Sequence, residues 1–215
     1  MFCRRITHPT DLEAIQTLRY RVLVEEMGRP HPNADVAAGR MAESLDAGAV
    51  HLGAYEQTPG RVAELVGALR INLPGHGDLR AFGEYHPAIL AKQGPRTGVV
   101  SRLVTAPHAR GGWGGPGLAL AIEAYRIALA ERLDAVEIDC HASLIGFFEW
   151  LGFVVYRRFA HPDFGDVALL RIHPFDRAAL EAAGSPLVAV FDEASAGEAG
   201  VAGVAGVAGA RRAQA

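Results

Sequence analysis

The sequence predicts an α/β domain in which helices pack against a mixed β-sheet. Several runs are rich in β-branched residues and bounded by turn formers, the clearest being TGVVSRLVTA at 97–106. Segments with apolar residues at helical spacing lie between these runs. The chain has 215 residues, of which 50% are hydrophobic, and this is enough to bury one substantial core.

The first predicted helix covers THPTDLEAIQTLRYRVLVEEMG at 7–28. Its apolar residues recur at helical spacing, Thr10 and Glu13 fit a capping box, and Gly28 is suited to end it. The later elements follow from the same kinds of pattern. In chain order they are a short helix at 39–48, strands at 50–56 and 62–73, a partly helical stretch at 81–94, the strand at 97–106, a helix with Leu118, Ile122, Tyr125 and Leu129 on one face, a strand at 134–140, a short helix at 143–152, and strands at 153–160 and 166–173.

The end of the chain has a different composition from the rest. The segment ASAGEAGVAGVAGVAGARRAQA at 194–215 repeats small residues that have little surface to bury. We therefore expect a folded domain at 1–184 and a flexible C-terminal extension at 185–215.

Several classes of protein are excluded by the composition. A net charge of −3 offers no electrostatic basis for binding nucleic acid. The two cysteines, Cys3 and Cys140, form neither a disulfide framework nor a zinc pattern, and the histidines lack ligand spacing, so no metal is predicted. No apolar stretch is long enough to span a bilayer and no signal-peptide core follows the first arginines, so we expect a cytoplasmic protein without a membrane span.

A cluster of five glycines, one tryptophan and one proline occupies 111–117. One interpretation is a loop whose bare backbone closes on a phosphate, assisted by the start of the helix that follows. The other is a strand-to-helix turn that needs positive φ angles. Taken alone, the cluster favours neither.

The context of this cluster resembles the GNAT acyltransferase superfamily over about residues 1–174. The matching features are Val104, Pro107, Arg110 and Gly111, then the glycines, a helix, a strand and FFEWLGF at 147–153. The resemblance implies a mostly antiparallel mixed sheet with flanking helices, in which two central parallel strands splay apart. The pantetheine arm of an acyl-CoA or acyl-phosphopantetheine cosubstrate would lie in the gap, with no permanently bound cofactor. The donor-binding residues it implies are Leu103, Val104, Thr105, Arg110, Gly111, Gly112, Trp113, Gly114 and Gly115.

Trp113 departs from the phosphate-loop pattern of that superfamily, because it stands where a glycine is expected. A distorted loop would suit the single phosphodiester of an acyl carrier protein, which makes such a protein a candidate partner. The alternative is that Trp113 packs on the sheet edge and CoA binds in the usual way.

A second series of residues is similar to the branch that contains acyl-homoserine lactone synthases and long-chain N-acyl amino acid synthases. The resemblance implies that Arg19, Arg70 and Ser101 bind the acceptor. Arg29 stands where the lactone synthases have an aromatic residue, which favours the N-acyl amino acid side. Val99 replaces the usual glutamate base. The matching residues are Arg19, Glu43, Asp46, Arg70, Ser101 and Arg102.

These charged residues also have a purely structural interpretation. Arg19, Asp46, Arg70 and Arg102 would form a buried ion network that braces the first helix against the sheet. An arginine inside a strand must find a carboxylate, from the protein or from a substrate.

The implied reaction is direct attack of an amine on a thioester carbonyl, with a backbone amide of 102–104 stabilising the oxyanion. Phe148 stands where many relatives have a tyrosine acid, and Cys140 is interpreted as a packing residue. His141 is interpreted either as a base or as a surface histidine at a strand end. The implied catalytic residues are Arg102 with the base candidates Glu26, Glu43, Asp46 and His141.

The sequence therefore predicts an N-acyltransferase that moves a medium- or long-chain acyl group to a small-molecule or peptide amine. A long chain needs an apolar tunnel, for which Leu103, Ile138, Phe147 and Val155 are candidates. Two alternatives are a short-chain CoA-dependent acetyltransferase and a catalytically lapsed protein that binds an acyl carrier.

Overall fold

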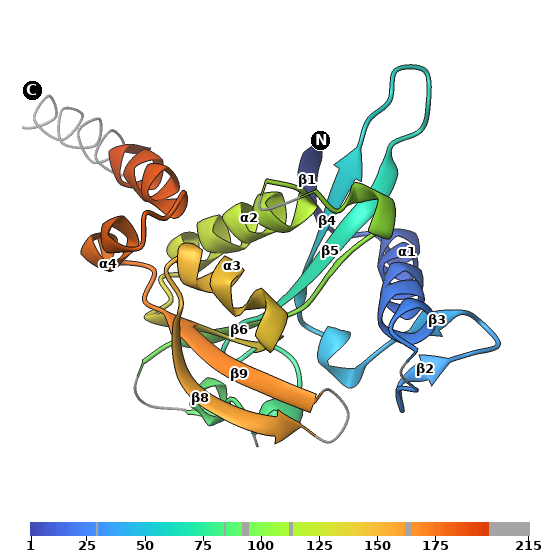
Figure 1. Cartoon of the computed structure of the whole chain (residues 1–215), viewed down its shortest axis with the longest axis horizontal. Coiled ribbons are helices and arrows are strands. Elements are labelled where there is room, and N and C mark those ends of the chain that lie inside the picture. Colours follow the sequence, from blue (N-terminus) through green and yellow to red (C-terminus); the bar gives the residue numbers. More distant parts are fainter. Residues whose placement is uncertain (29, 84, 92–94, 112–113, 162–164, 198–215) are drawn as a thin grey trace, which may run out of the picture.

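The fold is built on one seven-stranded sheet with the strand order β1-β4-β5-β6-β7-β9-β8 (Figure 1). Every neighbouring pair is antiparallel except β6 and β7, which are parallel, so the predicted mixed sheet is confirmed. The strands are β1 (Phe2–Ile6), β4 (Val50–Glu56), β5 (Glu64–Asn72), β6 (Thr97–Thr105), β7 (Ala135–His141), β8 (Val154–His161) and β9 (Gly165–Ile172). This computed structural model describes residues 1–28, 30–83, 85–91, 95–111, 114–161 and 165–197.

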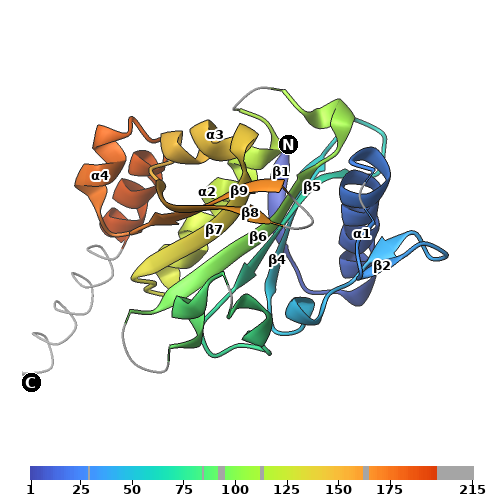
Figure 2. The same ribbon diagram turned by 60° about the horizontal axis from the view of Figure 1, so that its bottom comes forward.

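Helices cover both faces of the sheet (Figures 1 and 2). The alternation of side chains along β5 shows how the faces divide, because Leu69 and Ile71 pack with α2 and α3 while Ala68 packs with α1. The helices are α1 (Pro9–Arg19), α2 (Pro116–Ala130), α3 (Ile145–Trp150) and α4 (Arg177–Ala182). None of the helices in the described residues is both long and apolar enough to cross a membrane.

The first helix begins and ends differently from the prediction. His8 is its N-cap and accepts a hydrogen bond from the Thr10 amide at 3.3 Å, because Pro9 takes the first helical position. The predicted capping box of Thr10 and Glu13 is therefore wrong. The chain stays helical beyond Arg19, but as a π-helix over Tyr20–Glu26, a form often found at functional sites.

The stretch 39–48 was predicted as one short helix and instead forms two smaller elements. These are β3 (Arg40–Met41), which pairs with β2 (Ala34–Asp35), and a 3-10 turn over Ser44–Asp46. Gly39 and Gly48 at its ends have φ of 61° and 79°, so the backbone turns sharply at both.

The packed part of the chain extends past the predicted domain boundary at residue 184. Residues 187–197 are helical, and Leu187 and Val190 are buried in the main core. These two positions are three residues apart on one helical face and belong to the apolar run LVAVF at 187–191, which precedes the small-residue segment. The remainder of the predicted tail, 198–215, lies outside the described residues.

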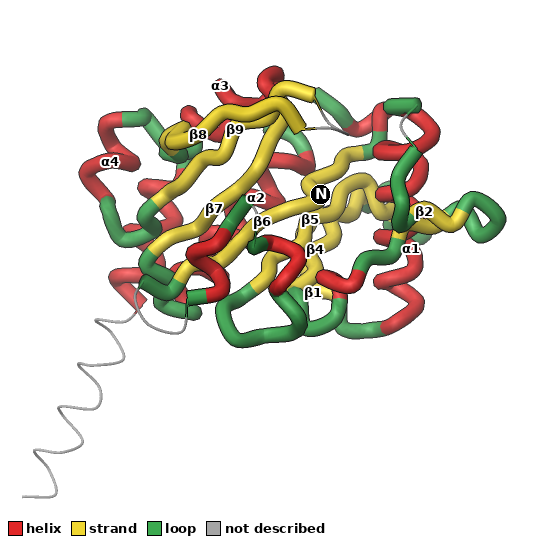
Figure 3. The backbone as a smooth tube through the Cα atoms, turned by 90° about the horizontal axis from the view of Figure 1, so that it is seen from below, coloured by secondary structure: helices red, strands yellow, loops and turns green. Residues whose placement is uncertain are grey.

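The parallel pair at the centre of the sheet separates partway along its length. β6 and β7 pair only from Thr97 with Ala135 to Val100 with Ile138. Beyond that point β6 continues beside β5 alone and β7 beside β9 alone. Figure 3 shows the strands in order from β8 at one edge to β1 at the other. This divergence is the splay that the resemblance implied.

A β-bulge shapes β6 directly after the splay begins. The register of β5 against β6 shifts between Ala68 and Arg70, so Arg102 and Leu103 both stand opposite Leu69. Arg102 has φ of 54°, a left-handed conformation that costs about 1–2 kcal/mol for a residue with a side chain. Bulges of this kind re-aim side chains and end strand pairing beside active sites.

Candidate active site

Charged side chains gather on the face of the sheet that α1 covers, between two apolar clusters. One cluster joins α1 to the sheet and includes Ile15 and Ala68. The other lies under the 79–89 segment and includes Phe82 and Val99. The charged residues between them form two groups, one on each side of the splay.

The first group, the arginine cluster, consists of Arg19, Glu43, Asp46, Arg70 and Arg102. Arg19 from the end of α1 donates to Asp46 at 2.7 Å. Arg70 from β5 donates to Glu43 at 2.8 Å and to Asp46 at 3.0 Å. Arg102 from the bulge holds Glu43 by two hydrogen bonds of 2.7 and 2.5 Å. The structure therefore brings together every residue that the sequence placed in the buried network.

The turn that carries the two carboxylates fixes their positions. Glu43 and Asp46 form a capping box, in which each side chain accepts from the backbone amide of the other. His51 accepts from Arg19 through Nδ1 at 3.2 Å, so its proton sits on Nε2, which donates to the Asp46 carbonyl oxygen at 3.1 Å. Burial lowers the pKa of His51, which agrees with this neutral form.

Electrostatics keep both carboxylates of the arginine cluster ionised. Burial alone would raise the pKa of Glu43, but the hydrogen bonds and charge of Arg102, followed by the charge of Arg70, lower it to about 2. For Asp46 the charge and hydrogen bond of Arg19 likewise outweigh burial and lower the pKa. Since three guanidinium groups face two carboxylates, the cluster holds one positive charge in excess.

The second group, the histidine cluster, consists of His86, Glu137, Asp139 and Arg171, and sequence reasoning missed it. His86 lies between Glu137 Oε2 at 3.0 Å and Asp139 Oδ1 at 3.3 Å. Arg171 from β9 donates to Glu137 Oε1 at 3.0 Å. Because ionised carboxylates only accept hydrogen bonds, both ring nitrogens of His86 must carry protons. Burial lowers the pKa of His86, but the hydrogen bonds to Asp139 and Glu137 outweigh it and raise the pKa.

A signal for the histidine cluster was present in the strand DAVEIDC. Val136, Ile138 and Cys140 point into the main core, so Glu137 and Asp139 alternate onto the opposite face. Two carboxylates on a covered face of a sheet require cationic partners. The partner His86 comes from a segment without periodicity, and no pattern indicated it.

The predicted base candidates His141 and Glu26 belong to neither cluster. His141 is exposed at the end of β7, and its Nδ1 is engaged by the side chain of Ser143 at 3.1 Å. Glu26 forms an exposed ion pair with Arg110, with Nη2 and Oε2 2.8 Å apart. Arg110, predicted to bind donor phosphate, also donates to the carbonyl oxygen of Thr105 at 3.0 Å.

The described glycines of the cluster at 111–117 do not have positive φ angles. Gly115 is the N-cap of α2 and supplies no side-chain cap, and a Cβ at Gly111 or Gly114 would meet open space. The start of α2 therefore has no side-chain cap, and the two interpretations of the glycine cluster stay predictions. The predictions that concern Gly112, Trp113 and Arg29 fall on residues outside those that the structure describes.

An apolar cavity of about 30 Å³ lies between the sheet and α2, beside the bulge. Leu103 of β6 lines it, together with Phe148, Phe153 and Leu187. Of the four residues expected to line an acyl tunnel, Leu103 is therefore the one found on this cavity. Ile138 is buried in the core nearby, and Phe147 and Val155 pack against that core.

Cys140 is buried next to the site, and burial raises the pKa of its thiol to about 12. A thiol in this state is a poor nucleophile, as expected for a packing residue. Within the described residues no group of three His, Cys, Asp or Glu side chains is arranged to hold a metal ion.

Comparisons with known proteins show where this fold has been seen before. No protein-family model matches the sequence, and no curated protein matches it either. FeeM, an N-acyl amino acid synthase from uncultured soil microbes, matches with a TM-score of 0.60 and 15% identity over 87% of this chain and 98% of that one. BjaI, a CoA-dependent acyl-homoserine lactone synthase solved with SAM and isopentyl-CoA, matches with a TM-score of 0.59 and 21% identity over 86% and 90%.

A third match is an acyl-CoA N-acyltransferase from Pseudomonas aeruginosa, with a TM-score of 0.52 and 22% identity over 79% of this chain and 96% of that one. All three matches span nearly the whole of the solved chains. The predicted GNAT-like fold is confirmed, and it is the fold of N-acyl amino acid and acyl-homoserine lactone synthases.

Proposed function

We propose that this chain is an N-acyltransferase that moves an acyl group from a thioester donor to the amine of an acceptor that also carries a carboxylate. The observation that carries the proposal is the splay between β6 and β7, flanked by a cationic cluster on one side and an anionic side chain on the other. The fold, shared with acyl-transferring enzymes, supports the same reaction class.

Three features support a thioester donor at the splay. After Val100, β6 has no strand partner on its β7 side, so an extended pantetheine arm has a free edge to pair with. The start of α2 has no side-chain cap, so its backbone amides and the positive end of the helix dipole can serve a phosphate. The cavity beside Leu103 is lined by apolar side chains, which suits an aliphatic chain. Acyl-CoA and acyl carrier protein both present this arm.

The charges at the splay support an amino acid acceptor. Arg102 has the most exposed side chain of the three arginines in the arginine cluster, at 19%, and it can meet a carboxylate. Asp139 on the opposite side is 38% exposed and can meet an ammonium group. A molecule with both groups would be oriented across the gap, with its amine beside the thioester.

In the proposed reaction the amine nitrogen attacks the thioester carbonyl carbon. The new C–N bond forms, the C–S bond breaks, and sulfur leaves with the electron pair as a thiolate that becomes the free thiol. A backbone amide in the Arg102–Val104 segment would stabilise the oxyanion, because a bulge leaves one residue outside the hydrogen-bonded ladder.

The first experiment is calorimetry of donor binding, with acetyl-CoA, octanoyl-CoA and an octanoyl acyl carrier protein compared in one buffer. Turnover is then measured by mass spectrometry with each donor and a mixture of the protein amino acids. Acylation of one or more amino acids supports the proposal. Absence of binding by all three donors and of any acylated product would overturn it.

A short-chain donor is the second candidate, and the size of the cavity favours it. A volume of about 30 Å³ is room for about two water molecules, so a medium or long chain would require Phe148 or Leu187 to move. Tighter binding and faster turnover with acetyl-CoA than with either octanoyl donor would select this candidate.

A further inference from the structure

The proposed reaction needs a group that receives the acceptor's ammonium and takes a proton from its nitrogen. Four carboxylates lie in the two clusters on this face of the sheet. Glu43 and Asp46 are 5% and 7% exposed and are bound by arginines, and Glu137 is 1% exposed between His86 and Arg171. Asp139 is different, because its side chain is 38% exposed.

We infer that Asp139 is the acceptor-amine site of this chain and the proton acceptor of the reaction, and that His86 positions it. The inference rests on the proposed function. It gives Asp139 the role of the base, because this chain has Val99 where the resemblance implied a glutamate base. It stands on geometry: β6 and β7 stop pairing at Val100 and Ile138, so Asp139 is the first β7 residue inside the splay.

The surroundings of Asp139 suit a fixed carboxylate with one side open. His86 is 1% exposed, donates to Asp139 Oδ1, and is itself held by Glu137. The Asp139 side chain stays 38% exposed at the start of the splay, so an ammonium group could replace solvent there. Because the hydrogen bond from His86 already fixes the Asp139 side chain, binding a ligand at its exposed part costs little side-chain entropy.

The acceptor nitrogen loses two protons during the reaction. An amino acid arrives mostly as its ammonium form, which an ionised carboxylate attracts. An ammonium nitrogen has no lone pair, so it first loses one proton, which passes through Asp139 to water. The free amine then attacks; as the C–N bond forms, the nitrogen becomes strongly acidic and passes its second proton to Asp139. Asp139 then releases the proton to the departing thiolate or to water, and the carboxylate is restored.

Two charged groups act on Asp139, namely His86 behind it and Arg102 from β6 across the splay. Burial alone would raise the pKa of Asp139, but His86 and then Arg102 lower it. The carboxylate is therefore ionised at neutral pH and ready to bind a cation. Removing the imidazolium of His86 should move the acidic limb of the pH–rate profile to higher pH.

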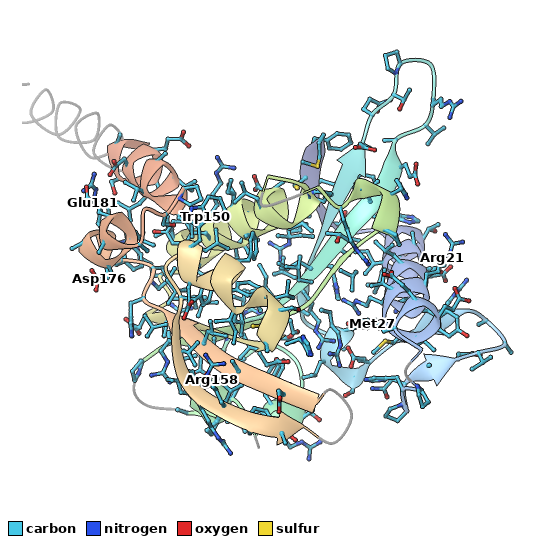
Figure 4. All side chains as sticks on the ribbon, in the orientation of Figure 1. Arg21, Met27, Trp150, Arg158, Asp176 and Glu181 are labelled. Carbon is cyan, nitrogen blue, oxygen red and sulfur yellow. The ribbon has the colours of Figure 1, made fainter. Side chains whose placement is uncertain are left out.

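The test compares wild-type chain with Asp139→Asn, using whichever of octanoyl-CoA and acetyl-CoA gives turnover and the amino acid that is acylated fastest. Hydroxylamine, which is uncharged at neutral pH, serves as a second acceptor after subtraction of its uncatalysed reaction. The matched control is Asp176→Asn, which makes the same chemical change at the N-cap of α4, far from α1 (Figure 4).

We expect Asp139→Asn to lower kcat/KM for the amino acid by about 100-fold or more. The loss for hydroxylamine should be clearly smaller, because hydroxylamine arrives as the free base and needs neither ammonium binding nor the first proton transfer. Donor affinity and thermal midpoint should stay near the wild-type values, as they should in Asp176→Asn. His86→Gln should give a smaller loss at neutral pH with the acidic limb moved upward. An equal loss with both acceptors, or near-normal turnover of the amino acid, would assign Asp139 a structural role and overturn the inference.

The same experiment separates this inference from the proposed function. If wild-type chain acylates amines and Asp139→Asn does so equally well, the inference alone fails. If wild-type chain acylates no amine, the proposed function fails and the inference fails with it.

Discussion

The two charged clusters on the α1 face of the sheet are built from similar side chains but differ in how completely they are closed. In the arginine cluster every carboxylate contacts at least two cationic or amide donors, and Arg19 and Arg70 are almost fully buried. In the histidine cluster Glu137 is enclosed to the same degree, but Asp139 keeps one side open. A fully buried ion network stabilises the fold and sets the local charge. A part-exposed carboxylate such as Asp139, which His86 holds in place, can also bind a ligand.

The largest expected difference between the clusters is in stability. Asp46→Ala leaves the buried guanidinium of Arg19 with His51 as its one hydrogen-bond partner among the described residues, which should lower the free energy of unfolding by about 3–5 kcal/mol. Asp139→Asn should lower it by less than about 1 kcal/mol, because the side chain is part-exposed and Asn still accepts from His86. Urea denaturation of both variants measures the contrast, and similar losses would show that the two clusters are equally structural.

Arg102 links the two clusters. Its removal should lower activity strongly and stability little. Arg102→Ala removes the cation nearest the splay, so we expect kcat/KM to fall by about 100- to 1000-fold. The fold should survive, because Arg70 still pairs with Glu43. Turnover is compared with circular dichroism and the thermal midpoint of the same sample. Near-normal turnover in a folded Arg102→Ala variant would remove Arg102 from the site.

The sequence predicted the arginine cluster well because its residues lie in elements with strong patterns. Arg70 and Arg102 lie inside predicted strands, and a charge there demands a partner. It could not predict the bulge that puts Arg102 at positive φ, since no turn-forming residue marks it. The histidine cluster was missed because His86 comes from an unpatterned segment and reaches Glu137 across 51 positions of sequence.

The helix at 187–197 was missed for a different physical reason. It begins with the apolar run LVAVF at 187–191, but the small-residue segment that starts at 194 led the whole end of the chain to be predicted as flexible. Only the tertiary structure shows that Leu187 and Val190 complete the core over α2 and α3.

Glu43 and His86 should give stability contributions that depend on pH with opposite sign and in different pH ranges. The pKa of Glu43 falls from 4.5 to about 2 on folding, so its contribution of about 3 kcal/mol is present above pH 4.5 and is lost as pH falls toward 2. The pKa of His86 is raised from 6.5, so its contribution is present below pH 6.5 and is lost as pH rises through the higher folded value.

Denaturation at several pH values measures both contributions. Glu43→Gln should flatten the acid limb of the stability profile, and His86→Gln should flatten the limb above pH 6.5. A profile that is unchanged in either variant would show that the corresponding cluster does not set the pH dependence.

The smallest expected effect concerns His141, which lies two residues beyond Asp139 on the same strand. His141→Asn keeps a side chain that can accept from the Ser143 amide, so the turn after β7 should stay capped and stability should change by less than about 0.5 kcal/mol. Since the ring is exposed and engaged with Ser143, we expect kcat/KM to stay within about threefold of wild type at pH 7. A fall near that expected for Asp139→Asn, with the acidic limb of the pH–rate profile abolished, would move the proton acceptor from Asp139 to His141. Because both residues follow the last pair of β6 and β7, this single comparison decides how far along the splay the amine is held.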